Sequence, residues 1–169
     1  KEEYPFYLLV PEGGANYYGM VGCQEIWKEL PQRADHLFVA QGTTTTSCGL
    51  LTGAPENTSM HVVPVLKGFD STAEMRKLLF PFLVDDETIS EYLERVVIHP
   101  DAHFGGYGKW NEELTGFIAK CEAEFNLPLD KIYTGKAFYA LMTWLEKQSF
   151  EAPQTVVFLH TGGLMNGGI

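Results

Sequence analysis

Five consecutive hydroxyl side chains follow the strand-like residues 36–40. The stretch is Gln41-Gly42-Thr43-Thr44-Thr45-Thr46-Ser47-Cys48-Gly49, and the pattern after it predicts the start of a helix. Backbone N–H groups at a helix N-terminus, with the positive end of the helix dipole behind them, bind anions, and threonine hydroxyls add hydrogen-bond donors. The candidate ligands of a small phosphate group are therefore Gly42, Thr43, Thr44, Thr45 and Thr46.

The same segment lacks the signatures of two common nucleotide sites. A P-loop places a lysine at the helix start, and a dinucleotide-binding loop has glycines at fixed spacing. Residues 42–49 have neither feature, which disfavours a nucleoside triphosphate and NAD and favours a phosphate monoester. The structural alternative is a threonine-rich turn that only caps a helix.

Two further turns lie at the ends of predicted strands. In His160-Thr161-Gly162-Gly163, Thr161 can place a hydroxyl at the carboxyl edge of a sheet, where open parallel sheets bind ligands. His160 could act as an acid or base, although a lone histidine at a strand end is more often packed or hydrogen-bonded. In Glu12-Gly13-Gly14-Ala15-Asn16, the paired glycines allow close approach to a ligand or a neighbouring loop, and a tight turn is the simpler interpretation.

Two tyrosines complete the set of candidate site residues. Tyr133 and Thr134 open a predicted helix and can donate hydrogen bonds, although Tyr133 could equally belong to the core. Tyr107 lies in the glycine-rich segment 105–108. Such a loop can close over a substrate or simply turn.

Short β-rich runs alternate with segments of helical period along the chain. This alternation predicts an α/β fold with a mostly parallel, twisted sheet and helices on both faces. Strands are expected at residues 6–10, 36–40, 61–66, 95–98 and 155–159. Pro64 in the third of these favours an edge position or a bulge.

Helices are expected between these strands. One covers residues 17–30 and is closed by Pro31. Ser71 and Glu74 form the pattern of a capping box, followed by an apolar face at Met75, Leu78, Leu79 and Phe82. Asn111 is expected to cap the next helix, and the last helix carries Phe138, Leu141, Met142 and Leu145 on one face.

Composition limits the class of protein. The 169 residues include 12 basic and 22 acidic side chains, a formal net charge of −10, which argues against a nucleic-acid binder. No apolar run approaches the roughly 18 to 20 residues of a membrane span. Cys23, Cys48 and Cys121 are too few and too scattered for a disulfide framework or a zinc site, so we expect a cytoplasmic protein without a metal. Residues 1–169 are expected to form one domain, and the absence of an initial methionine is consistent with part of a longer chain.

Five segments, taken in order, resemble one enzyme family. They are Glu12-Gly13-Gly14-Ala15-Asn16, the strand followed by Gly42 to Leu50, Gly106-Tyr107-Gly108, Tyr133-Thr134-Gly135-Lys136 and His160-Thr161-Gly162-Gly163. These segments resemble the pyridoxal-phosphate enzymes called 1-aminocyclopropane-1-carboxylate deaminase and D-cysteine desulfhydrase, which have the tryptophan-synthase β-like fold. The resemblance extends over nearly the whole chain.

The resemblance implies a cofactor, pyridoxal 5'-phosphate, and a small amino acid as substrate. It places the phosphate at residues 42–46, Thr134 and Thr161 near the pyridine nitrogen, and Tyr107 and Tyr133 as catalytic residues facing the substrate. It further implies release of ammonia and a 2-oxo acid, with sulfide when the substrate is D-cysteine. The family commonly forms homodimers.

Two departures from the family pattern affect the expected activity. The family's cofactor-binding lysine, and the Ser-Asn segment that holds the substrate carboxylate, lie in the N-terminal half and have no visible counterpart here. Lys136 does not stand at the family's lysine position. The chain therefore resembles the C-terminal portion of a longer enzyme, and alone it should lack covalent catalysis.

The substrate is left open by the resemblance. Deaminases of the cyclopropane substrate have a glutamate and a leucine where this chain has Thr134 and Thr161, which are similar to the D-cysteine desulfhydrase branch. Gly108-Lys109-Trp110 also departs from the residues usual in the family. The alternative function is a non-catalytic α/β module that binds a small phosphorylated ligand through residues 42–46.

Overall fold

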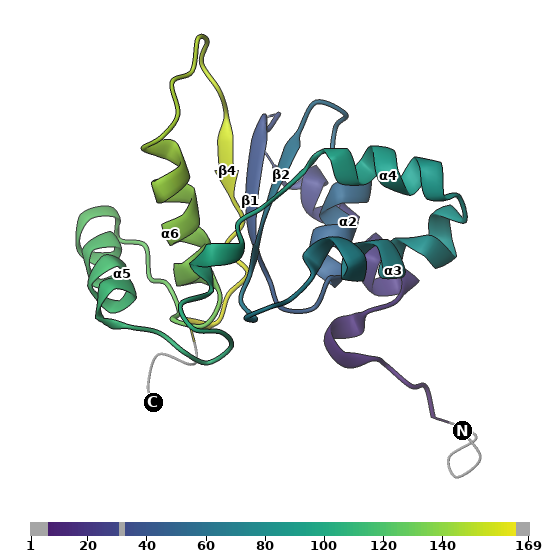
Figure 1. The fold of residues 1–169 in the computed structure, drawn as a ribbon, viewed down its shortest axis with the longest axis horizontal. Helices are drawn as coiled ribbons and strands as arrows, with labels where there is room; N and C mark the ends of the chain where they lie inside the picture. The colour runs from purple at the N-terminus through teal and green to yellow at the C-terminus, as the bar shows by residue number, and fades with distance from the viewer. Residues whose placement is uncertain (1–6, 31–32, 165–169) are drawn as a thin grey trace.

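A computed structural model describes residues 7–30 and 33–164 of the chain. Its four strands form one parallel sheet in the order β3-β2-β1-β4 (Figure 1). Their bounds are β1 His36–Gln41, β2 Ser59–Pro64, β3 Val96–Ile98 and β4 Val156–Phe158. The predicted α/β fold with a parallel sheet is confirmed.

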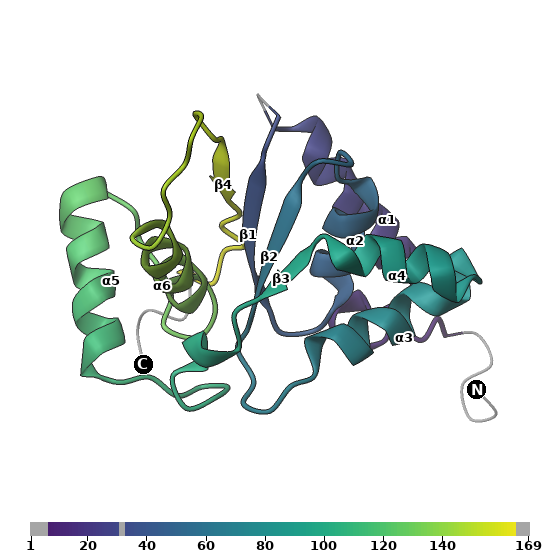
Figure 2. The ribbon, with the colours of Figure 1, turned by 45° about the horizontal axis from the view of Figure 1, so that its top comes forward.

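Helices cover both faces of this sheet. Figure 2 shows α5 and α6 on one side and α1 to α4 on the other. The helices are α1 Tyr17–Gln24, α2 Thr45–Gly53, α3 Ser71–Leu83, α4 Asp86–Glu94, α5 Glu112–Phe125 and α6 Thr134–Leu145, with 3₁₀ turns η1 Glu12–Gly14, η2 Glu25–Lys28 and η3 Pro100–His103. None of the helices in the described ranges is long and apolar enough to cross a membrane.

The central strand β1 supplies the core on both sides of the sheet. Leu37 and Val39 pack with residues of the helices α1 to α4, whereas Phe38 and Ala40 pack with residues of α6. Successive side chains of a strand point to opposite faces, so a strand covered on both sides must be apolar throughout. That is why residues 37–40 form a continuous apolar run.

Three of the predicted elements differ from the structure. Residues 7–10 form no strand and have exposed side chains, because no described strand pairs with them; Phe6 lies outside the described residues. The helix expected at 17–30 ends at Gln24 and continues as η2, and Pro31 also lies outside the described part. β2 lies inside the sheet, where Pro64 is tolerated as its last residue because the next N–H, that of Val65, donates to Gln41 O at 3.0 Å.

The start of α3 also differs from the prediction. Asp70 caps the helix, because its carboxylate accepts the Ala73 N–H at 2.9 Å. The cap therefore lies one residue before Ser71, the cap residue of the predicted capping box. Ser71 is instead the first helical residue, and its buried hydroxyl has no hydrogen-bond partner within the described ranges. The predicted apolar face is confirmed, since Met75 and Leu79 are fully buried.

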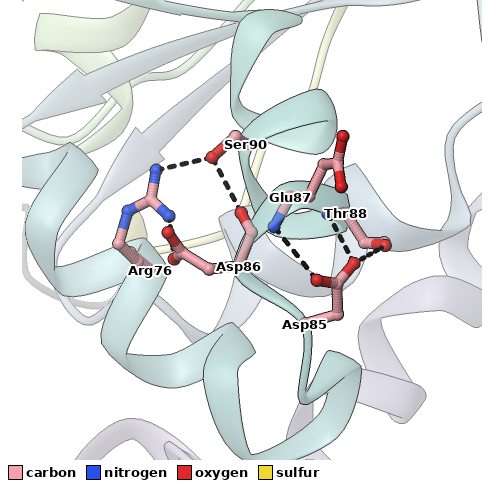
Figure 3. A network of polar contacts seen from close by, with 6 residues as sticks. All are labelled: Arg76, Asp85, Asp86, Glu87, Thr88 and Ser90. Atoms are coloured by element: carbon pink, nitrogen blue, oxygen red, sulfur yellow. Dashed lines mark hydrogen bonds and ion pairs between the residues drawn. The ribbon is translucent and has the colours of Figure 1, made fainter.

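The sequence pattern missed helix α4. The helix is short and mostly polar, but Ile89, Tyr92 and Leu93 lie at the i, i+3, i+4 spacing of a core-facing stripe and pack against the core. Figure 3 shows what holds it: Asp85 accepts the N–H groups of Glu87 and Thr88, and Arg76 of α3 pairs with Asp86. The N-terminal cap and the ion pair to α3 therefore add to the packing of the apolar face of this helix.

The predicted cap of α5 is confirmed. The Asn111 side chain accepts the Leu114 N–H at 3.0 Å. Leu114, Ile118 and Cys121 are buried, but Phe125 at the end of the helix is 58% exposed. The buried face of α5 packs against α6, the helix that presents Tyr133 at its N-terminus.

Candidate functional site

A cavity of about 560 Å³ lies where β1 and β2 end and brings five segments of the chain together. It is lined by Pro11, Glu12, Ala15, Gly42, Thr43, Thr44, Leu66, Phe69, Glu74, Tyr107 and Tyr133. Gly42, Thr43, Thr44, Tyr107 and Tyr133 of the predicted site residues thus meet in one place. A cavity of similar volume, about 580 Å³, lies between η3 and α6 and contains none of the predicted site residues.

One wall of the cavity offers hydrogen-bond donors at the N-terminus of α2. Thr44 is the N-cap residue of α2, and its side chain accepts no hydrogen bond from the helix. The first backbone N–H groups of α2 are therefore not bonded to the cap side chain. Ser47 in the first turn donates to Thr44 O at 3.0 Å and accepts from the Gln41 side chain at 2.9 Å, which orders the turn from behind. The arrangement leaves backbone donors and the positive helix end available to an anion.

Thr45 and Thr46 do not line the cavity. Both lie in the first turn of α2, and Thr45 is nearly fully buried. The Thr45 hydroxyl has no hydrogen-bond partner within the described part of the chain. An unsatisfied buried hydroxyl is unfavourable, so this group is a ready donor for a ligand or a water molecule.

Two glycines allow the walls of the cavity to approach each other. A Cβ atom at Gly42 would lie 2.9 Å from Tyr133 Cε1, so the loop packs directly on the tyrosine ring. Gly13 has a φ of +61°, and a Cβ atom there would lie 2.2 Å from Thr43 Oγ1. Of the glycine pair after residue 12, Gly13 therefore allows close packing against the phosphate-loop candidate, which was one of the predicted uses of the pair.

Tyr107 and Tyr133 face each other across the cavity. Their ring centroids are 6.0 Å apart and the rings are inclined at 68°. Burial, followed by the hydrogen bond shared with Tyr107, raises the pKa of Tyr133 to about 12. At neutral pH Tyr133 therefore keeps its proton and can act as a hydrogen-bond donor, not as a base.

Thr134 and Thr161 lie away from the cavity lining. The Thr134 side chain is fully buried; its hydroxyl donates to Asp130 Oδ2 at 2.5 Å and accepts the Asp130 N–H at 2.9 Å. Thr161 is exposed in the turn after β4. The structure thus separates these two threonines from the five predicted residues that share the cavity.

Asp130 organises the start of α6, and the sequence analysis missed it. Its Oδ1 accepts the N–H groups of Ile132 and Tyr133, both at 2.7 Å, and its Oδ2 accepts the Thr134 N–H at 2.8 Å. Burial would raise the pKa of this carboxyl, but these hydrogen bonds and that of the Thr134 hydroxyl lower it. An aspartate a few residues before a helix is a common turn signal that could have revealed it.

The same carboxylate also touches the C-terminal turn. Gly163 has a φ of +89°, and a Cβ atom there would lie 2.8 Å from Asp130 Oδ2. Asp130 therefore ties the N-terminus of α6, which carries Tyr133, to the turn that contains Thr161.

Two carboxylates give the cavity a mixed electrostatic character. Glu12 and Glu74 line it, whereas no lysine or arginine does so among the described residues. An anion would depend on backbone N–H groups, hydroxyls and the α2 dipole for binding. The carboxylates attract a positive group such as an ammonium, so the cavity suits a ligand with charges of both signs.

Comparisons with known proteins were made on sequence and on structure. No protein-family model matches this chain. Proteins of Pyrococcus abyssi and Pyrococcus horikoshii, both named “Putative 1-aminocyclopropane-1-carboxylate deaminase”, are 34% and 31% identical to it over 167 and 168 residues. The D-cysteine desulfhydrase of Serratia proteamaculans is 30% identical over 169 residues. Each match covers 92% of this chain and 49% to 50% of the relative.

A solved structure agrees with these relatives. The crystal structure of an ACC (1-aminocyclopropane-1-carboxylate) deaminase homologue matches with a TM-score of 0.69 at 30% identity. The match covers 92% of this chain and 49% of that one. The chain thus spans about half the length of the relatives it matches. By sequence and by fold, this chain is similar to about half of the length of proteins named 1-aminocyclopropane-1-carboxylate deaminase and D-cysteine desulfhydrase.

Proposed function

We propose that this chain is the cofactor-binding part of a pyridoxal-phosphate enzyme that releases ammonia and a 2-oxo acid from a small amino acid. The observation that carries the proposal is the cavity in which the uncapped start of α2 faces Tyr107 and Tyr133. The names of the relatives support the reaction type. We further propose that the intact enzyme is a homodimer, as the family resemblance implies, and that it is cytoplasmic, as the few scattered cysteines predict.

The residues at the α2 end of the cavity fit the phosphate of this cofactor. Gly42, Thr43 and Thr44 would hold it through backbone N–H groups and hydroxyls. When bound, the cofactor would withdraw electrons from the α-carbon of the amino acid. A partner for its ring nitrogen is not offered by Thr134, whose hydroxyl proton is committed to Asp130.

The other residues of the cavity would act on the substrate. Glu12 and Glu74 attract the ammonium group of an amino acid, and Tyr133 holds a proton at its hydroxyl at neutral pH. Tyr107 shares a hydrogen bond with Tyr133, so one of the two hydroxyl protons remains to be donated to the substrate. These groups bind and orient a small zwitterion.

Among the two substrates of the family, we propose D-cysteine, with elimination of sulfide. Thr134 and Thr161 are similar to the desulfhydrase branch, and a thiolate leaves more easily than a cyclopropane carbon. The test compares kcat/KM for both substrates in the intact enzyme and in Thr161→Leu. Thr134→Glu is unsuitable for this purpose because it would place a second carboxylate against Asp130. Faster ring opening in the unmutated enzyme would refute the assignment.

Phosphate binding tests the site itself. Inorganic phosphate and pyridoxal phosphate are titrated into the protein by calorimetry, with Thr43→Val and Thr44→Val as variants. Thr115→Val on α5 is the matched control, because its hydroxyl bonds only to α5 carbonyls in the described structure. We expect weaker binding in the first two variants alone. Equal affinity in all four proteins would contradict the site, and binding without turnover in the intact enzyme would favour the non-catalytic module.

A further inference from the structure

A buried lysine reaches from α6 to the loop that carries Tyr107. The Lys136 side chain is fully buried, and its Nζ donates to the backbone oxygen of Gly106 at 2.8 Å. This is the one hydrogen bond of the Lys136 ammonium in the described ranges of the chain. Burial lowers the pKa of Lys136, and the charge of Asp130 opposes that shift.

Stability alone does not explain a lysine at this position. A buried ammonium that meets one neutral carbonyl loses more hydration free energy than the hydrogen bond returns. Lys136 also lies in the first turn of α6, where the helix dipole disfavours a positive charge. An apolar side chain of similar length would fill this space at lower free energy, so the charge points to a role in the site.

The loop needs such an anchor because glycines dominate it. Gly105, Gly106 and Gly108 have φ values of +94°, +115° and +66°, which favour glycine and leave few side chains to pack. Gly106 O also accepts the Lys109 N–H at 3.1 Å, so the carbonyl bound by Lys136 is the one that closes the turn. Tyr107, the next residue, lines the cavity and is 58% exposed.

We propose that Lys136 is a positioning residue that holds Tyr107 against Tyr133. Tyr133 directly precedes α6, the helix that carries Lys136, and Gly106 directly precedes Tyr107. One hydrogen bond, from the Lys136 side chain to Gly106 O, therefore links the helix that follows Tyr133 to the loop that carries Tyr107. The role assigned to Tyr107 in this inference rests on the proposed function, whereas the link itself rests only on the fold.

Hydrogen–deuterium exchange of the unliganded chain tests the link. In Lys136→Met, which keeps the length but loses the donor, we expect the Lys109 amide to exchange about tenfold faster, with β1 and β2 amides unchanged. Lys136→Arg, which keeps a donor, is expected to restore slow exchange. If the Met variant does not fold, Lys136→Leu, which also lacks a donor, takes its place. Unchanged exchange at Lys109, or an equal increase throughout the sheet, would overturn the proposal.

Kinetics of the intact enzyme distinguish the Lys136–Gly106 link from the proposed role of Tyr107 at the substrate. If Tyr107 faces the substrate, Lys136→Met lowers kcat/KM about tenfold, Lys136→Arg recovers most of it, and phosphate affinity at residues 42–44 does not change. Faster exchange at Lys109 with normal kcat/KM would support the link and contradict the role of Tyr107 in the proposed function. A lower kcat/KM without faster exchange would overturn the link.

Discussion

A chain of three histidines makes the stability of this protein sensitive to mild acid. His61 is 2% exposed and stacks on Phe38 with ring centroids 4.1 Å apart. Its Nε2 lies 3.1 Å from His36 Nδ1, and its Nδ1 lies 2.9 Å from His99 Nε2. Burial, then the charges of His99 and His36, lowers the pKa of His61 from 6.5 to about 3.

The sign and size of the effect follow from that shift. His61 is neutral in the folded protein and binds a proton on unfolding, so its contribution is complete above pH 6.5 and is lost as the pH falls from 6.5 toward 3. Each pH unit in that range costs about 1.4 kcal/mol, so the step from pH 6.5 to 5 costs about 2 kcal/mol. For a domain of this size, that loss lowers Tm by about 4 to 8 °C.

The measurement is urea unfolding at several pH values between 7 and 5. His61→Gln removes the titrating group and keeps side-chain hydrogen bonding, so its free energy of unfolding should fall less steeply than that of the unmutated protein. His160→Gln, which changes a histidine outside the chain of three, should keep the full slope. Parallel curves for His61→Gln and the unmutated protein between pH 6.5 and 5 would refute the reasoning.

Three further substitutions test the site. Gly42→Ala should lower the free energy of unfolding in urea by about 1 to 3 kcal/mol and weaken phosphate binding, because the new Cβ would contact the Tyr133 ring. Gly116→Ala on α5 is the control: its Cβ would meet open space, so the free energy of unfolding should rise by about 0.5 to 1 kcal/mol. Glu74→Gln should tighten inorganic phosphate about two- to fivefold by calorimetry, and weaker binding would contradict the electrostatic argument. Asp130→Asn should cost about 1 to 2 kcal/mol at pH 7. The pKa of Asp130 is depressed below 3.8, so the stability difference between the Asn variant and the unmutated protein should shrink as the pH falls from 3.8 through the folded-state pKa. A difference that is unchanged at the lowest pH would contradict a stabilising role of the ionised carboxylate.

The features that the sequence alone determined are those with short-range signals. Residues 37–40 are apolar throughout because both faces of β1 are covered, and this pattern is visible without any partner. Asn111 satisfies an N–H three residues away, so its cap is a local property. The hydroxyl run after Gln41 likewise lies at a helix start within the same few residues.

Only the tertiary structure decided which segments meet. Gly42, Tyr107 and Tyr133 come from three separate parts of the chain, and their contact depends on how α6 and the loop at 105–108 pack beside β1. Thr134 turns toward Asp130 and away from the cavity because a buried hydroxyl and a buried carboxylate satisfy each other. Local propensity extends over a few residues, whereas such contacts are selected by the free energy of burying and pairing groups that are distant in sequence.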